Sequence, residues 1–483
     1  MSEAPSISHT SAASPTTTSL WHSGLHALAA SLLSIVLGLA LNIIVARAVG
    51  PAGKGDYDLI LATAALLGMV LGFSLPSGVT YVVAQGRADP RLLRLPLAGI
   101  ALGQGLAAAL VLYALGFTDY ASFLLPSSWG AWVILAIVLH VFFASWAGCL
   151  RAMLVGRQKI IQANQRELTS RAIHVFLLLA VAGVLMSSAR PVTAKMLIAF
   201  SVAAALLSCL ILFHAVRVMP SAAPSRSGFK EIVAYALPCY IGNLVQFLNY
   251  RLDVFFVSFF AGAAAVGLYT LAAALAQQIW LISAAAAMVL LPRVAAGQDA
   301  AAANAGKTAQ ATRLALWCSA CAAMLLAVLA KPLVQKLFGE AFLPSLYALW
   351  WLLPGIVAFS IVNVIASYFA GMGKPRLNLL VALVGLFLTV LLDLMLIPRH
   401  RIIGAAIAST ASYVSSAVLT LWLFQRESRL GLLQIVLPTR ADVETLRALL
   451  RAVRGVPPAS EAGAAANAHG NRRNSPPADE QKP

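Results

Sequence analysis

Apolar residues occupy most of the chain in stretches of about 20, separated by short segments rich in charge, glycine or proline. A helix needs about 20 apolar residues to cross the roughly 30 Å hydrocarbon core of a bilayer, so this spacing predicts membrane-spanning helices. Twelve such helices are expected. They cover residues 25–49, 57–84, 93–117, 129–154, 164–187, 195–218, 231–261, 265–291, 313–338, 345–370, 377–397 and 403–425.

The positions of the basic residues predict how these helices are oriented. With twelve crossings and a cytoplasmic N-terminus, most of the 34 Lys and Arg residues fall in segments on the cytoplasmic side. Short cytoplasmic loops of membrane proteins carry this excess of positive charge. The fold class expected is therefore an all-α polytopic membrane protein of about 12 transmembrane helices, with both termini in the cytoplasm.

Sequence similarity between the two halves predicts an internal repeat. Three residues at the junction of the first two predicted helices recur 212 positions later: Gly50, Gly55 and Tyr57 correspond to Gly262, Gly267 and Tyr269. Residues 156–164 and 371–378 also resemble each other, each after the fourth helix of its half. Repeats of this kind are common in transporters. We expect six-helix bundles at residues 25–218 and 229–426, joined by a cytoplasmic linker at 219–228.

The two ends of the chain have a different composition from the predicted bundles. Residues 1–24 are rich in Ser and Thr and predict a disordered cytoplasmic tail, and residues 455–483, which lack aromatic residues, predict another. Between the last bundle and the C-terminal tail, residues 427–454 predict a cytoplasmic amphipathic helix. This helix is expected either to lie on anionic lipid or to be solvated.

Charge and motif content exclude several classes of protein. The net charge is +17, but the basic residues are scattered singly between apolar runs and form no cluster, so no nucleic-acid partner is expected. The five cysteines lie in apolar segments and lack the further ligands of a zinc site, so no metal is expected. Phosphate-binding loops, zinc-binding histidine pairs and nucleophile elbows are missing. We expect no enzyme activity, no catalytic residue and no cofactor, with energy taken from gradients or the membrane potential.

Four strings of sequence resemble a known family. They are ARAVGPAGKGDY, RLDVFFVSFFAGAAAVGLYTLAAAL, KPLVQKLFGEAF and LIPRHRIIGAAIASTASY. In this order they resemble the polysaccharide transporters of the multidrug/oligosaccharidyl-lipid/polysaccharide exporter superfamily, which are bacterial flippases for lipid-linked oligosaccharides. The resemblance runs from about Ala27 to Phe424 and implies two six-helix bundles around a central cavity that opens alternately to each side.

Polar residues of the helix at 231–261 are candidates for substrate binding. A charge at bilayer depth costs about 2.5–3.5 kcal/mol on insertion scales and so calls for a partner or a wet cavity. Arg251 and Asp253 point about 200° apart on this helix and cannot pair with each other. Asp253 shares a face with three other polar residues, Asn243, Gln246 and Tyr250. This face is expected to line the cavity while Arg251 attracts a diphosphate; the alternative is a structural ion pair to another helix.

A second candidate cluster lies on the helix at 164–187. Glu167, Arg171 and His174 share one helical face. They are expected to form a vestibule that attracts phosphate, or else an interfacial salt bridge with a snorkelling arginine.

Two further residues are candidates for a coupling ion. His140 is predicted near the middle of a helix, where it either carries a proton or simply hydrogen-bonds within the packing. Asp393 is predicted near the outer end of its helix, where it either binds a coupling cation or pairs with Arg399.

The function expected is translocation of a polyprenyl-diphosphate-linked oligosaccharide across the inner membrane for O-antigen, capsule or exopolysaccharide synthesis. The partners expected are this substrate, membrane lipids, and a polysaccharide polymerase and glycosyltransferases. Two alternatives stay open at this point. One is a cation-coupled drug or metabolite antiporter of the same superfamily, and the other is a structural scaffold for a polysaccharide synthase.

Overall fold

The computed structural model describes six stretches of the chain, residues 17–118, 121–126, 130–187, 192–219, 229–297 and 301–453. Their regular structure is helical throughout, and they contain no strand. The predicted segments at both ends and in the linker fall largely outside these stretches, which leave out residues 1–16, 220–228 and 454–483.

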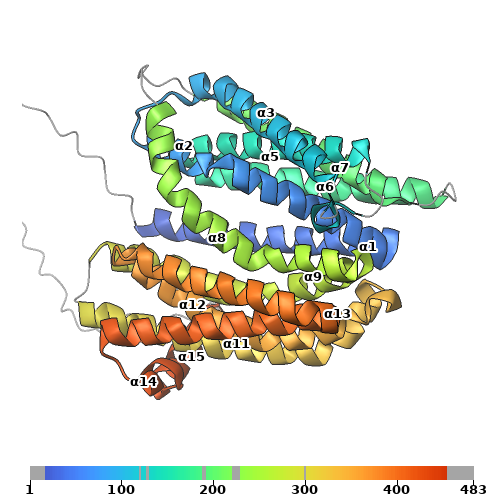
Figure 1. Cartoon of the computed structure of the whole chain (residues 1–483). Helices are drawn as coiled ribbons and strands as arrows, with labels where there is room; N and C mark the ends of the chain where they lie inside the picture. The colour runs from blue at the N-terminus through green and yellow to red at the C-terminus, as the bar shows by residue number, and fades with distance from the viewer. Residues whose placement is uncertain are drawn as a thin grey trace, which may run out of the picture. The chain divides into compact units, whose positions relative to one another are not determined.

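The helices follow one another along the chain and are joined by short connections (Figure 1). They are α1 (Thr17–Gly72), α2 (Leu75–Ala84), α3 (Pro90–Leu115), α4 (Ala121–Leu124), α5 (Ala131–Gly156), α6 (Ile160–Ser187), α7 (Ala194–Arg217), α8 (Phe229–Ala261), α9 (Ala263–Gln277), α10 (Trp280–Ala295), α11 (Ala301–Leu337), the 3-10 helix η1 (Glu340–Phe342), α12 (Ser345–Gly371), α13 (Pro375–Ser428), α14 (Leu432–Val436) and α15 (Arg440–Val453).

The lengths of these helices match a protein that crosses the membrane many times. Within the described residues, eight helices are long and apolar enough to span a bilayer, or nine if α9 and α10 together form one span. Two of the eight are themselves pairs of helices, because the backbone breaks at Gly50 in α1 and at Arg401 in α13. Each predicted spanning segment falls on one helix, except those at 57–84 and 265–291, which fall on two. The prediction of an all-α polytopic membrane protein is confirmed.

Two predicted helices are interrupted in the structure. The one predicted at 57–84 ends at Gly72, and α2 begins only after Phe73 and Ser74 adopt left-handed conformations with φ of 45° and 50°. Pro76, in the first turn of α2, has no amide hydrogen with which to continue the preceding helix. The one predicted at 265–291 is broken between Gln277 and Trp280. Hydropathy does not register the first break, because Phe73 and Ser74 lie among apolar and small residues. The second falls at Gln277 and Gln278, a polar stretch too short to end a predicted span.

The chain forms two compact units, each of which combines segments that are separated in the sequence. The first contains residues 1–278, 326–355 and 382–412, and the second contains residues 279–325, 356–381 and 413–483. The long helices α11, α12 and α13 therefore contribute to both. The six-helix bundles expected at 25–218 and 229–426 stay a prediction.

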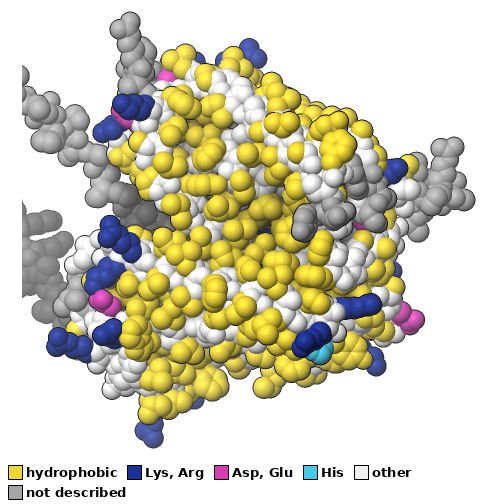
Figure 2. All heavy atoms as spheres, in the orientation of Figure 1, with side chains coloured by type: hydrophobic (Ala, Val, Ile, Leu, Met, Phe, Trp, Pro, Cys, Tyr) yellow, Lys and Arg dark blue, Asp and Glu magenta, His cyan; other side chains and the backbone are white. Residues whose placement is uncertain are grey.

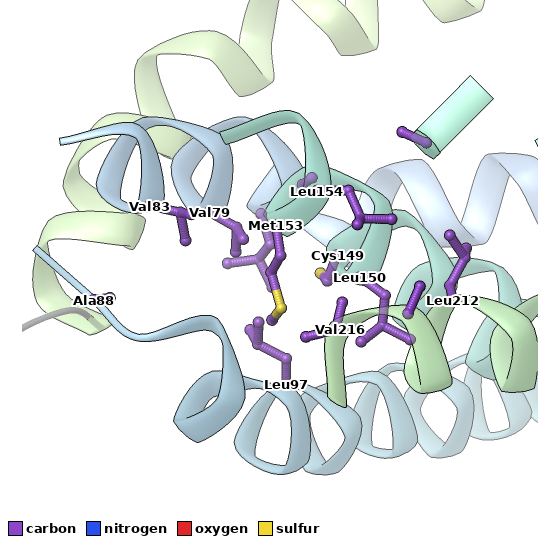
Figure 3. Close-up of a cluster of buried hydrophobic side chains, with 14 of the residues drawn as sticks. Val79, Val83, Ala88, Leu97, Cys149, Leu150, Met153, Leu154, Leu212 and Val216 are labelled. Atoms are coloured by element: carbon purple, nitrogen blue, oxygen red, sulfur yellow. The ribbon is translucent and has the colours of Figure 1, made fainter. Parts of the chain in front are cut away.

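The first unit contains a core built from α2, α3, α5 and α7 (Figure 3). Val79, Leu97, Leu150, Met153 and Val216 are each at most 2% exposed and pack together there. Apolar side chains also lie on the outer surface of these helices, for example Leu92, Leu102 and Leu106 of α3, and apolar side chains are spread over the face shown in Figure 2. Exposed apolar residues in such numbers are expected of helices that face lipid rather than water.

In the second unit, the C-terminal helices α14 and α15 dock on α11. Arg313 of α11 forms a bidentate ion pair with Asp442 of α15, with distances of 2.7 Å from Nε to Oδ2 and 3.0 Å from Nη2 to Oδ1. Trp317 Nε1 donates to the carbonyl of Val436 at 3.0 Å. The segment predicted as an amphipathic helix on lipid or in solvent therefore packs against another helix of the same chain, α11.

Candidate substrate cavity

Two of the arginines predicted to bind substrate line one cavity in the first unit. The cavity has a volume of about 350 Å³ and is bordered by α1, α6, α8 and α9. Arg171 reaches it from α6 and Arg251 from α8. Arg251 has no hydrogen-bond or ion-pair partner among the described residues. Its guanidinium is therefore free to meet an anion, for which its planar fork is suited.

The charge of Arg171 is partly neutralised on its own helix. Its Nη2 lies 2.7 Å from Oε1 of Glu167, the residue one helical turn before it, and Oε2 of Glu167 lies 2.9 Å from Nε of Arg151. Two arginines thus share one carboxylate, and the cluster keeps a net positive charge. All three side chains are between one third and one half exposed, so the ion pairs themselves contribute little to stability.

A second cavity of about 350 Å³ adjoins the first. The two share the side chains of Asn42, Arg251 and Ala274. The second cavity is also lined by Asp58, the only acidic residue among those that line it.

Asp58 is held by two neighbours, so the second cavity is not acidic. It forms an ion pair with Lys54, which is only 1% exposed, and it accepts a hydrogen bond from Thr270. Sequence reasoning missed this pair, because Lys54 was placed in the junction between the helices predicted at 25–49 and 57–84 and Asp58 in the second of them. The three charges of the string GKGDYD, beside a tyrosine that recurs in the second half, were the available signal.

Matching hydrogen-bond networks occur around the two repeated tyrosines. The Tyr57 hydroxyl lies 2.8 Å from Oγ of Ser201, which in turn lies 3.3 Å from Nε2 of His174. The Tyr269 hydroxyl lies 3.2 Å from Oγ of Ser409 and donates to Asp253. Each tyrosine is therefore hydrogen-bonded to a serine of a later helix and linked to a titratable side chain: Tyr57 reaches His174 through Ser201, and Tyr269 contacts Asp253 directly.

These networks separate His174 and Asp253 from the arginines near them in sequence. His174 faces Ser201 rather than the arginine cavity. Asp253 is 5% exposed, whereas Arg251, two positions earlier, is exposed and lines both cavities. This divergence is the one expected from helical spacing.

The polar stripe predicted on α8 contributes to different surroundings. Asn243 lines a third cavity, of about 390 Å³, and its Nδ2 donates to Oγ of Ser74 at 3.1 Å. Gln246 and Tyr250 hydrogen-bond each other. Asp253 is buried against Tyr269. The four residues share one helical face, but they do not form one site: Asn243 and Asp253 bond residues of other helices, and Gln246 and Tyr250 bond each other.

The two residues predicted to bind a coupling ion lie in different places. His140 lines the third cavity together with Asn243, and its Nδ1 is buried without a hydrogen-bond partner among the described residues. Asp393 is fully buried on α13 with both carboxylate oxygens unpartnered among those residues, so it does not pair with Arg399. Asp253 is close enough to interact with it electrostatically. No group of three or more metal-ligating His, Cys, Asp or Glu side chains occurs in the part of the chain that the structure describes.

Two family models match the sequence of this chain. A model of polysaccharide biosynthesis proteins matches residues 20–298, and a model of the lipid II flippase MurJ matches residues 172–453. Each match covers more than half of the chain. The chain belongs to this family of polysaccharide and lipid flippases. No curated protein matches its sequence.

Solved structures agree with the family in fold. The chain is similar to the lipid II flippase MurJ in an inward closed conformation, with a TM-score of 0.66, 13% identity, and coverage of 84% of this chain and 90% of that one. It is also similar to the MATE multidrug transporter DinF-BH, at a TM-score of 0.59, 14% identity, and coverage of 86% and 98%. For the Vibrio cholerae MATE transporter VcmN in its bent form, the values are 0.53, 13%, 86% and 98%. At these identities the likeness concerns the fold alone.

Proposed function

We propose that this protein moves polyprenyl-diphosphate-linked oligosaccharide repeat units across the cytoplasmic membrane by alternating access. The observation that carries the proposal is the cavity shared by Arg171 and Arg251. A diphosphate is a compact anion that arginine binds with charge-assisted, bidentate hydrogen bonds. In the membrane interior such an anion has no other compensation for its lost hydration.

The remaining parts of the substrate follow from this placement. The sugars would occupy the polar and uncharged lining beside Arg251, where Gln277, Gln278 and Asn42 offer amide groups. The polyprenyl chain would stay in the bilayer, against apolar helix faces such as those in Figure 2. The product would serve the assembly of a surface polysaccharide, namely O-antigen, capsule or exopolysaccharide.

Direction of transport has a physical source in this scheme. Moving net negative charge outward across an inside-negative membrane is favourable by about 2.3 kcal/mol per charge per 100 mV. Asp393 is the candidate for coupling to a cation gradient, because a fully buried and unpartnered carboxylate needs a proton or a metal ion to compensate its charge. His140 is a second candidate for carrying a proton.

Charge in the cavity favours a flippase over the alternatives. An exporter of organic cations needs an exposed acid in its cavity, whereas the only acid lining the two arginine cavities among the described residues, Asp58, is held by Lys54 and Thr270. A scaffold for a synthase needs no cavity.

Reconstitution tests the proposal directly. Purified protein in liposomes should make a fluorescent polyprenyl-diphosphate-linked sugar in the inner leaflet accessible to an outside quencher or lectin. Movement of an organic cation instead would support the antiporter, and movement of neither would support the scaffold.

A further inference from the structure

The third cavity differs from the other two in its chemistry. It is bordered by α1, α2, α3, α5 and α8, and none of the residues that line it is an Asp, Glu, Lys or Arg. Small and apolar side chains make most of its wall. Its volume of about 390 Å³ and its mostly apolar lining with a few polar groups are those of a ligand site.

Two buried polar atoms on its wall have no hydrogen-bond partner among the residues that the structure describes. Gln104 of α3 is 8% exposed, and its Oε1 accepts no hydrogen bond from a described residue. Nδ1 of His140 on α5 is also buried and forms no hydrogen bond with a described residue. Leaving such a group unsatisfied costs about 1–3 kcal/mol. Both groups line this cavity, so a ligand with hydrogen-bonding groups would satisfy them.

This cavity adjoins the second cavity, with which it shares two lining residues. Ala65 and Phe247 line both the third cavity and the one that contains Arg251. Phe247 precedes Arg251 by one turn on α8. A ligand whose anionic group meets Arg251 would therefore place its adjoining group beside Phe247, at the entrance of the uncharged cavity.

We propose that this third cavity is a subsite for the uncharged sugar attached directly to the diphosphate, and that it favours a sugar with an acetamido group. The inference rests on the proposed function. An acetamido group can donate to Gln104 Oε1 and present its methyl to the apolar wall. A uronic acid would bury a carboxylate with no cation in the lining, which is strongly unfavourable. A polyprenyl chain would leave Gln104 and His140 unsatisfied.

Binding of three probes to the purified full-length protein tests this subsite. The probes are a polyprenyl diphosphate without sugar, the same lipid carrying N-acetylglucosamine, and the same lipid carrying glucuronic acid. The wild type should bind the N-acetylglucosamine lipid most tightly. Gln104→Leu should weaken that binding about tenfold, equivalent to about 1.4 kcal/mol, and should change binding of the sugar-free lipid less than about twofold.

A second variant tests the cavity by filling it. Gly72 lines the third cavity, and a Cβ atom added there would meet nothing within 4 Å. Gly72→Leu should therefore fold, keep the affinity for the sugar-free lipid and lose the preference for the N-acetylglucosamine lipid. Gly99→Leu is the matched control, because Gly99 is an exposed helical glycine with equally open surroundings outside the lining. It should leave all three affinities unchanged.

The possible outcomes separate this inference from the proposed function. If Gln104→Leu weakens the binding of all three probes equally, the sugar subsite is wrong. If it tightens the binding of all three, the cavity binds the polyprenyl chain instead. Arg251→Ala should weaken all three probes. If it weakens none while Gln104→Leu still discriminates between them, the arginine site of the proposed function fails and the sugar subsite stands. If the wild type binds no probe, both fail.

Discussion

Gly55 and Gly267 face each other where α1 and α9 lie side by side (Figure 1). A Cβ atom added to either glycine would lie 3.0 Å from the backbone nitrogen of the other, and it would also run into a carbonyl oxygen, that of Ala263 or of Pro51. These glycines are equivalent members of the sequence repeat. The repeat therefore brings its own two copies into contact, and backbone rather than side chains forms that contact.

Replacing either glycine should destabilise the protein severely. Because the obstacle is backbone on both sides, Gly55→Ala or Gly267→Ala must push the two helices apart, at a cost of about 3 kcal/mol or more. We expect loss of folded protein from the membrane and a lower melting temperature in detergent. Gly99→Ala, at an open helical position, should instead be neutral or slightly stabilising. Normal abundance of both repeat variants would contradict the close contact.

Loss of Arg251 should abolish transport without loss of protein. Because its guanidinium has no partner among the described residues, Arg251→Ala breaks no ion pair, and abundance should stay near that of the wild type. Arg251→Lys should restore part of the activity, since it keeps the charge without the bidentate fork. Polysaccharide export and flipping in liposomes measure the effect. Loss of the protein from the membrane would indicate a structural role instead.

Removing the buried charge of Asp393 should affect coupling rather than folding. Asp393→Asn eliminates an unpartnered buried carboxyl group, so the protein should remain folded. The flipping rate in liposomes should then no longer respond to an imposed proton or sodium gradient, whereas in the wild type it should. Glu340→Gln, at an exposed carboxylate, is the control and should keep the response. An unchanged response in Asp393→Asn would exclude this residue as the coupling site.

The docking of α15 on α11 should depend on pH in the acid range. Burial opposes ionisation of Asp442, but hydrogen bonds from Arg313 and Thr439 outweigh it and hold the pKa of Asp442 below its usual value of about 3.9. A lowered folded-state pKa means that the stabilisation is complete above the unfolded-state value and is lost as pH falls through the folded-state value. Protection of the α15 amides against hydrogen exchange, measured relative to their intrinsic rates, should therefore stay high at neutral pH and be lost only at pH below about 4.

A neutral substitution should reproduce that loss at neutral pH. Asp442→Asn removes charged hydrogen bonds to Arg313 worth about 2 kcal/mol, so α15 should exchange rapidly even at pH 7. Glu444→Gln, an exposed acid on the same helix, is the matched control and should leave the exchange slow. Slow exchange in Asp442→Asn would mean that other contacts hold α15 in place.

Orientation in the membrane can be tested by cysteine labelling. In a variant without the native cysteines, a single cysteine at Gly228 or Gly306 should react only from the cytoplasmic side. One at Tyr120 or Ala264 should react only from the outside, as the distribution of basic residues predicts. Exchange of sides at any position would overturn the topology of twelve crossings.

The fold class followed from the sequence because its cause is local. Hydrophobic length decides whether a segment spans a bilayer, and that length can be counted along the chain. The opposite directions of Arg251 and Asp253 were equally predictable, since they depend only on the helical period. The breaks at Phe73 and Ser74 were not, because apolar and small residues there give no hydropathy signal.

Partners that are distant in sequence required the tertiary structure. Arg171 and Arg251 lie on different helices, and only the packing of α6, α8 and α9 places both beside one cavity. The same packing holds Asp58 between Lys54 and Thr270 and leaves Gln104 and His140 without partners. The sequence by itself determined the spanning helices, the repeat and the excess of basic residues. Only the tertiary structure decided which polar groups meet, because their contacts depend on how separate helices pack and not on the spacing within any one of them.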